Sequence, residues 1–281
     1  MDDRFDPIPT TVRVTSPDDP RIAEYRALRE NRLIRPTDDA PHGLFIAEGE
    51  KVVRLLLAGN ESGCLYEPRS VLVAENRVAI DAAWLRESPV PVYAASRAVM
   101  DAVVGFPIHR GVLASAFRRP DPPLNDLLAA AGTLLVCEGL ANHDNLGGLF
   151  RAAAALADRP ALLLDSTSCD PLYRKCIRVS MGHALRVPAA RLNPFDLCLV
   201  REAGFTAVAL TTDASAAAIG NVAVPAKSAL LLGAEGPGLS AEAMRSADVR
   251  VRIPIRPGVD SLNVVTAAAI ALHRIGNPTG L

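Results

Sequence analysis

The sequence predicts an α/β protein in which a small α/β/α domain precedes a larger domain built on a mostly parallel sheet. Strand-like apolar runs alternate with helical segments along most of the 281 residues. Runs such as Leu-Leu-Val at 134–136 do not alternate with polar residues, as expected of strands with helices on both faces. The segment Arg-Arg-Pro-Asp-Pro-Pro at 118–123 can continue neither a helix nor a central strand. We therefore predict a front domain over 1–117, a linker over 118–123 and a second domain over 124–281.

The front domain is expected to alternate helices and strands. An arginine-rich helix is predicted over 21–35. Short apolar runs predict the strands, at 43–47, 70–74, 90–94 and 111–116. Helical patterns fill the intervals, at 48–58, 79–87 and 96–104.

The second domain continues the alternation with more hydrophobic strands. These are predicted at 133–138, 161–165, 206–211, 229–233 and 250–255. Helices are predicted between and after them, at 146–156, 194–203, 241–247 and 261–275. In open parallel sheets, ligands bind beyond the carboxyl ends of the strands. Three polar loops begin at such ends, after Glu138, Leu232 and Ile255.

Composition excludes several classes of protein. The net charge of −1 gives no global basic signature of a nucleic-acid-binding protein. The five cysteines include no C-x-x-C pair and the five histidines are scattered, so neither a disulfide framework nor a metal site is expected. No apolar run is long enough for a membrane helix, and the N-terminus lacks the features of a secretory signal. These features favour a protein of the cytoplasm.

Positive charge is concentrated in two stretches. The first holds five arginines within fifteen residues, namely Arg21, Arg26, Arg29, Arg32 and Arg35. The second contains Arg174, Lys175, Arg178 and Arg186. Arginine suits bidentate contacts with phosphate, but both stretches are also compatible with an ordinary solvated surface.

The first polar loop leads into a helix that carries an unexpected charge. Gly147 and Gly148 permit close approach of a ligand or another backbone. Arg151 interrupts the otherwise apolar helix that Asn145 opens. It is either a functional cation or a salt-bridged, snorkelling side chain.

The other two loops follow buried strands. Residues 233–240 hold three glycines and a proline, but their spacing fits neither a dinucleotide fingerprint nor a P-loop. The alternative is a tight turn after which Ser240 caps a helix. In the third loop Asp260, Ser261 and Asn263 precede an alanine-rich helix, and Asp260 or Ser261 is a natural N-cap.

Taken together, the loops resemble one family. The pattern Asn145-x-Gly147-x-x-x-Arg151, the stretch 233–240 and Asp260-Ser-Leu-Asn263 are similar to the three motifs of the SpoU-type (TrmH-like) branch of the SPOUT RNA methyltransferases. Residues 170–182 also resemble this branch, although members more often have a small residue where this chain has His183. The likeness spans about 133–275. Residues 45–51 are similar to the ribosomal-protein-like substrate-binding domain that many members carry.

The resemblance implies a fold, a cofactor and a reaction. Members have a deep trefoil knot and transfer a methyl group from S-adenosylmethionine to an RNA ribose 2′-hydroxyl. It also implies a homodimer, with the site assembled at the interface. No metal is implied.

The resemblance assigns roles to individual residues. Arg151 would be catalytic, with Asn145, Ser261 and Asn263 orienting it or the ribose, and Glu235 organising the second loop. Because a guanidinium hardly ever loses its proton, we expect Arg151 to act by charge and not as a base. The expected cofactor-binding positions lie on the second and third loops, at Leu232, Gly233, Gly238, Ile253, Ser261 and Leu262. The expected RNA contacts are Arg21, Arg26, Arg29, Arg32, Arg35 and Arg178.

We therefore expect an RNA 2′-O-ribose methyltransferase that acts on ribosomal RNA. One alternative is transfer RNA as the substrate. Another is an RNA-binding or ribosome-assembly factor without catalysis, although such a factor has no need for Asn145, Arg151, Ser261 and Asn263 together. A nucleotide-dependent oxidoreductase fits poorly, because the glycine spacing is wrong and an acidic ribose ligand is missing.

Overall fold

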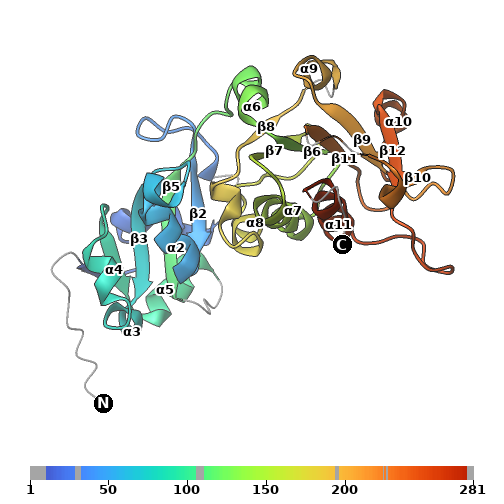
Figure 1. The fold of residues 1–281 in the computed structure, drawn as a ribbon. Helices are drawn as coiled ribbons and strands as arrows, with labels where there is room; N and C mark the ends of the chain where they lie inside the picture. Colours follow the sequence, from blue (N-terminus) through green and yellow to red (C-terminus); the bar gives the residue numbers. More distant parts are fainter. Residues whose placement is uncertain are drawn as a thin grey trace. The chain divides into compact units, whose positions relative to one another are not determined.

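The computed structural model describes residues 11–28, 33–105, 111–193, 196–223, 225 and 227–276. The chain forms two compact units (Figure 1). Unit 1 comprises Met1–Pro120 and Leu172–Arg186, and unit 2 comprises Asp121–Pro171 and Val187–Leu281. The first division falls within the predicted linker. The segment Leu172–Arg186, which the sequence places in the second domain, packs with unit 1.

Unit 1 is built on a mixed five-stranded sheet. Its strand order is β1-β4-β3-β5-β2, in which β5 runs antiparallel to both of its neighbours and the other pairs are parallel. The strands are β1 (Thr11–Val14), β2 (Leu44–Glu48), β3 (Pro68–Ala74), β4 (Val92–Ala95) and β5 (Val112–Phe117). The helices are η1 (Pro20–Leu28), α2 (Glu50–Leu57), η2 (Gly59–Ser62), α3 (Glu75–Val78), α4 (Ala82–Arg86), α5 (Arg97–Val104), α8 (Arg174–Val179) and η3 (His183–Leu185).

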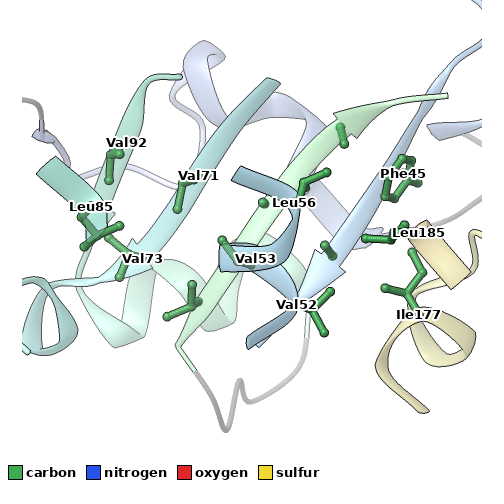
Figure 2. Close-up of a cluster of buried hydrophobic side chains, with 14 of the residues drawn as sticks. Phe45, Val52, Val53, Leu56, Val71, Val73, Leu85, Val92, Ile177 and Leu185 are labelled. Carbon is green, nitrogen blue, oxygen red and sulfur yellow. The ribbon is translucent and has the colours of Figure 1, made fainter. Parts of the chain in front are cut away.

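The segment Leu172–Arg186 contributes to the core of unit 1. Ile177 of α8 and Leu185 of η3 are fully buried in the cluster that also holds Val52 and Leu56 of α2 (Figure 2). Burial of one such side chain stabilises a fold by roughly 1.5–3 kcal/mol. This contribution explains why the segment belongs to unit 1 although its neighbours in sequence belong to unit 2.

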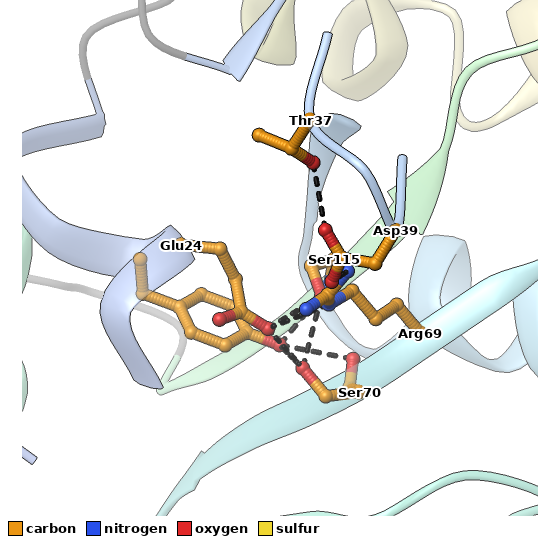
Figure 3. A network of polar contacts seen from close by, with 7 residues as sticks. Glu24, Thr37, Asp39, Arg69, Ser70 and Ser115 are labelled. Carbon is orange, nitrogen blue, oxygen red and sulfur yellow. Dashed lines mark hydrogen bonds and ion pairs between the residues drawn. The ribbon is translucent and has the colours of Figure 1, made fainter. Parts of the chain in front are cut away.

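A buried polar network holds η1 against the sheet of unit 1 (Figure 3). The Tyr25 hydroxyl lies 2.9 Å from the carbonyl oxygen of Ser70 and accepts a hydrogen bond from the Ser115 backbone N–H at 3.0 Å. Glu24 accepts hydrogen bonds from the hydroxyl groups of Ser70 and Ser115. Arg69 lies 3.6 Å from Glu24 and 2.7 Å from Asp39. Burial raises the pKa of Tyr25, so this phenol stays neutral.

Unit 2 contains a seven-stranded sheet in which every pair of neighbouring strands is parallel. The order is β10-β12-β9-β11-β6-β7-β8. The strands are β6 (Thr133–Cys137), β7 (Pro160–Leu164), β8 (Ala189–Arg191), β9 (Thr206–Leu210), β10 (Ala217–Ala218), β11 (Ser228–Leu232) and β12 (Val249–Arg252). The mostly parallel sheet predicted from the unbroken apolar runs is confirmed.

Helices cover both faces of this sheet. On one face α6 (Leu124–Ala130), α9 (Cys198–Glu202) and α10 (Ala241–Ser246) pack on the alternate side chains of the strands. On the other face α7 (His143–Leu156) lies beside α11 (Val264–Gly276), and η4 (Ile219–Asn221) contacts α11. The predicted arrangement of helices on both faces is therefore confirmed.

Several local predictions need correction. Within the predicted helix over 21–35, residues up to Leu28 belong to the 3-10 helix η1, Leu33 is α-helical, and residues 29–32 lie outside the described part. The predicted helix over 79–87 is shorter than expected, since α4 spans only Ala82–Arg86, and α3 (Glu75–Val78) before it was not predicted. β1, β8, β10, α6 and α8 were not predicted, because these elements are short and show little periodicity.

Candidate functional site

The first two predicted loops leave neighbouring strands of unit 2. Cys137 at the end of β6 pairs with Leu232 at the end of β11. The ladder extends one residue further, because the Glu138 backbone N–H donates to the Leu232 carbonyl at 2.9 Å. The Glu138 carboxylate then accepts a hydrogen bond from the Ser240 backbone N–H at 2.8 Å. The second loop is thus tied at both ends to the first.

A chain of amide hydrogen bonds connects all three loops. The side-chain Nδ2 of Asn145 donates to the Glu235 carboxylate, and Asn145 Oδ1 accepts from Asn263 Nδ2 at 2.9 Å. The Oδ1 of Asn263 accepts from the Val265 backbone N–H at 2.9 Å. Because each amide uses its oxygen and its nitrogen, this chain fixes the orientation of both side chains. Asn145, at the centre of this chain, is buried.

The helix α7 combines an ordinary start with an unusual surface. Asn142 caps it by accepting from the Asp144 backbone N–H at 2.8 Å. A Cβ atom added to Gly148 would lie 2.7 Å from Cγ2 of Val265, so glycine lets α7 approach α11 closely. Gly147 is buried as well, so both glycines serve the close packing of α7.

Arg151 itself is exposed. Among the described residues it makes neither a hydrogen bond nor an ion pair, so the salt-bridged alternative finds no support there. A cation on an apolar helix, with two glycines one turn before it, is suited to contact an anionic ligand.

The second loop is a tight turn built on glycine. A Cβ atom on Gly233 would lie 2.1 Å from the carbonyl carbon of Gly238, and Gly238 has a φ of +75°. Ala234 and Gly238 form an antiparallel bridge that closes the turn. Ser240 caps α10 by accepting from the Ala243 backbone N–H at 3.1 Å, as expected.

The third loop corrects the predicted N-cap. Neither Asp260 nor Ser261 caps α11; Asn263 accepts from the Val265 backbone N–H in the helix that begins at Val264. The helix starts later than predicted because Asn263 satisfies the early N–H group itself. Asp260 and Ser261 are exposed in the preceding loop.

A cavity of about 280 Å³ lies between the third loop and the end of β9. Its lining includes Ile253 and Leu262, two of the residues predicted to bind the cofactor. The others, Leu232, Gly233, Gly238 and Ser261, lie outside the lining. Thr211 and Thr212 also line the cavity, and the sequence analysis missed them. Thr211 ends a predicted strand and Thr212 follows it, and this position at a carboxyl end is the signal that could have identified them.

A second polar network holds the start of the first loop. Asp165, after β7, accepts hydrogen bonds from the side chains of Thr167 and Ser168 and from the Ser168 backbone N–H. Ser168 Oγ accepts from the Leu140 backbone N–H at 3.0 Å, and Arg191 donates to the carbonyl oxygens of Asp165 and Ser168. Burial raises the pKa of Asp165, but these hydrogen bonds outweigh burial and hold it below its ordinary value.

The arginines predicted to contact RNA lie in different environments. Arg21 is paired with Asp19 through two hydrogen bonds, which lower the pKa of that carboxyl group to about 2. Arg26 donates to the carbonyl oxygens of Pro17 and Asp19. Arg35 is exposed, whereas Arg29 and Arg32 lie outside the described residues. Arg178 lies 3.5 Å from Glu48 within unit 1.

The described residues show neither a metal-binding cluster nor a membrane-spanning helix. They contain no group of three histidine, cysteine, aspartate or glutamate side chains that could hold a metal ion. Within that same part of the chain, no helix has the length and apolar character needed to cross a membrane.

Comparison with known proteins identifies the family of this chain. The SpoU rRNA methylase family matches residues 132–273. An uncharacterized tRNA/rRNA methyltransferase of Mycobacterium bovis is 44% identical over 268 residues, which cover 92% of this chain and 90% of that protein. A 23S rRNA (adenosine(1067)-2′-O)-methyltransferase of Streptomyces laurentii is 30% identical over 151 residues, covering 53% of this chain and 56% of the relative.

A solved structure extends the likeness to the whole fold. The AdoMet-bound rRNA methyltransferase of Sinorhizobium meliloti is 25% identical and has a TM-score of 0.75, and the match covers 97% of this chain and 99% of that one. The family match takes in Asn145, Arg151, Glu235 and Asn263, whose geometry is described above. The chain therefore belongs to the SpoU rRNA methylase family of RNA methyltransferases.

Proposed function

We propose that the protein methylates a ribose 2′-hydroxyl of ribosomal RNA, with S-adenosylmethionine as the methyl donor. The observation that carries this proposal is the hydrogen-bond chain from Glu235 through Asn145 to Asn263, which joins three loops at the start of α7, the helix that also carries the exposed Arg151. The 23S rRNA 2′-O-methyltransferase of Streptomyces laurentii, to which the chain is similar, supports the 2′-O position and the ribosomal substrate. The AdoMet bound to the Sinorhizobium meliloti enzyme supports the donor.

The chemistry of the cavity beside the third loop suits this donor. The aliphatic side chains of Ile253 and Leu262 can cover an adenine ring and keep water from a sulfonium. The hydroxyl group of Thr211 and the charges of Asp260 and Arg256 can meet the ribose and the zwitterionic amino-acid end. The main chain at Leu232, Gly233 and Gly238 would complete the site from the second loop. When bound, S-adenosylmethionine supplies an electrophilic methyl group on a sulfonium.

Arg151 would stabilise the negative charge that develops on the ribose 2′-oxygen as this oxygen loses its proton. A guanidinium is a poor base because it stays protonated in proteins, but it is a strong donor to oxyanions and phosphates. A pre-positioned donor of this kind contributes about 10²–10³ to a rate. The adjacent phosphate or a water molecule would take the proton.

The other residues would position this centre. Asn145 and Asn263 hold α7 against the third loop, and Glu235 fixes the second loop to Asn145. Ser261 is exposed next to the cavity residues Asp260 and Leu262 and would contact the ribose or the donor. We also propose a deep trefoil knot, a homodimer formed through unit 2 and a cytoplasmic location.

The experiment that tests this proposal combines isotope labelling with nucleoside analysis. The purified protein is incubated with methyl-labelled S-adenosylmethionine and, separately, unmodified rRNA transcripts, tRNA transcripts and ribosomal subunits. The RNA is then digested, and the labelled nucleosides are identified by mass spectrometry. Label on ribose oxygen in rRNA supports the proposal, label on ribose in tRNA corrects the substrate, and label on a base overturns the 2′-O assignment. Bound donor without label in any RNA would favour a non-catalytic RNA-binding factor.

A further inference from the structure

The segment Leu172–Arg186 has one apolar side and one basic side. Its apolar residues Cys176, Ile177, Ala184 and Leu185 are buried in unit 1. The remaining side chains include Arg174, Lys175, Arg178 and Arg186, and the segment contains no aspartate or glutamate. Arg186 is exposed, and the side chain of Arg178 is 39% exposed. The segment therefore presents a basic surface on unit 1.

A buried carboxylate orients two of these arginines. Glu48 ends β2, the edge strand against which α8 packs, and its side chain is only 8% exposed. Its Oε2 atom lies 3.4 Å from Nη1 of Arg174 and 3.5 Å from Nη1 of Arg178. The two arginines are four residues apart and so lie on one face of α8. A carboxylate held in the fold restricts the orientations of both guanidinium groups.

The arginines of η1 are arranged differently. Arg21 is neutralised locally by two hydrogen bonds to Asp19, and Arg26 is bound to backbone carbonyl groups on the preceding turn. These contacts fix the conformation of the residues that immediately precede η1. Arg35 is also exposed, and Arg29 and Arg32 lie outside the described residues. Within the described residues, the segment Leu172–Arg186 offers a partly exposed Arg178 and an exposed Arg186 that can meet an external anion.

We propose that the basic side of Leu172–Arg186 is an RNA-docking surface of unit 1, and that Glu48 positions Arg178 and Arg174 to grip phosphate groups. Planar guanidinium groups bind phosphate in a bidentate manner, and phosphate contacts fix the register of a protein on nucleic acid without reading its sequence. The proposal rests on the proposed function, because it assumes an RNA substrate. It assigns docking to a segment from the methyltransferase half of the sequence.

The test measures RNA affinity as a function of salt for the full-length protein. The probes are labelled 16S and 23S rRNA transcripts and bulk tRNA, and binding is followed from about 0.05 to 0.5 M salt. One lost phosphate contact lowers the slope of log K against log salt by about 0.9 on a duplex and about 0.7 on a single strand. If the variant and the wild type bind equally at 1 M salt, a slope difference of about 0.9 makes the affinity of the variant roughly eightfold lower than that of the wild type at 0.1 M salt. We expect this change for Arg178→Ala and for Arg186→Ala.

A matched control removes the same charge from the opposite edge of the sheet. Arg13 lies on β1, its side chain is 52% exposed and it pairs with Glu75. Arg13→Ala is expected to leave both the affinity and the salt slope unchanged. Equal effects of Arg13→Ala and Arg178→Ala would overturn the docking surface, as would failure of all three probes to bind.

Glu48→Gln separates positioning from simple attraction. Removing a negative charge should strengthen RNA binding if only net charge matters, whereas loss of positioning should weaken it. We expect weaker binding, with a thermal unfolding midpoint that confirms a folded variant. Stronger or unchanged binding would refute the role of Glu48. Because Glu48 is buried, Arg178→Lys provides a second test: it keeps the charge, loses the bidentate fork and should also bind more weakly.

Parallel measurements separate this inference from the proposed function. S-adenosylmethionine binding is followed by calorimetry, and the position of the transferred methyl group is determined for each variant. Ribose labelling with RNA affinity that does not depend on Arg178 or Arg186 overturns the surface and leaves the activity standing. Methyl transfer to a base overturns the 2′-O proposal, while the salt series still decides the surface.

Discussion

The contact between α7 and α11 predicts that Gly148→Ala destabilises unit 2. The new Cβ atom would lie 2.7 and 2.9 Å from the two γ carbons of Val265, and β-branched valine has little rotamer freedom in a helix. Overpacking of this kind costs about 1–3 kcal/mol. The higher helix propensity of alanine relative to glycine offsets about 1 kcal/mol of this loss in the free energy of unfolding. The net loss is then roughly 0–2 kcal/mol, with a central value of about 1 kcal/mol.

Thermal unfolding tests this value. A loss of about 1 kcal/mol lowers the unfolding midpoint by roughly 2–4 °C in a domain of this size. Combining Gly148→Ala with Val265→Ala should relieve part of the clash. A double-mutant cycle measures the resulting interaction free energy between the two positions. Gly220→Ala is the control, since a Cβ atom there meets nothing within 4 Å. A higher midpoint for Gly148→Ala than for the wild type would refute the close approach of α7 and α11.

Two further predictions concern the polar networks of unit 2. Asn145→Asp places a carboxylate beside Glu235, so we expect roughly 1–3 kcal/mol lower stability in urea unfolding at pH 7 and reduced methyl transfer. A variant as stable and active as the wild type would refute the positioning role proposed for Asn145. Asp165 has a lowered pKa, so its contribution to stability is complete above the unfolded value of about 4 and is lost as the pH falls through the folded value. Asp165→Asn should therefore weaken the protein at neutral pH and flatten its acid-unfolding profile, and an unchanged profile would contradict this assignment.

The sequence predicted the architecture of unit 2 because its central strands are unbroken apolar runs, which have few alternatives to a covered parallel sheet. It also brought the first two loops together, since the carboxyl ends of parallel strands share one edge. It did not predict that Asn145 would bond to Asn263, because hydrogen-bond partners depend on how α7 and α11 pack. The cap at Asn263 was missed for a related reason, since three polar residues in succession offered several possible caps.

Unit 1 was harder to predict where tertiary contacts override local pattern. Residues 21–35 were predicted as one helix, yet Pro20–Leu28 form the 3-10 helix η1, which the hydroxyl group of Tyr25 and the carboxylate of Glu24 attach to the sheet. The segment Leu172–Arg186 follows a strand of unit 2 in sequence, and only the burial of Ile177 and Leu185 places it in unit 1. No local signal reports such a long-range contact.

The most direct test of the account is the rate of methyl transfer by Arg151 variants. Single-turnover rates are measured at saturating RNA and S-adenosylmethionine for the wild type, Arg151→Ala and Arg151→Lys, with the product identified as a 2′-O-methyl nucleoside. We expect the rate to fall by a factor of about 10²–10³ for Arg151→Ala and by less for Arg151→Lys, with unchanged binding of the donor. Ribose methylation by Arg151→Ala at the wild-type rate would contradict the account.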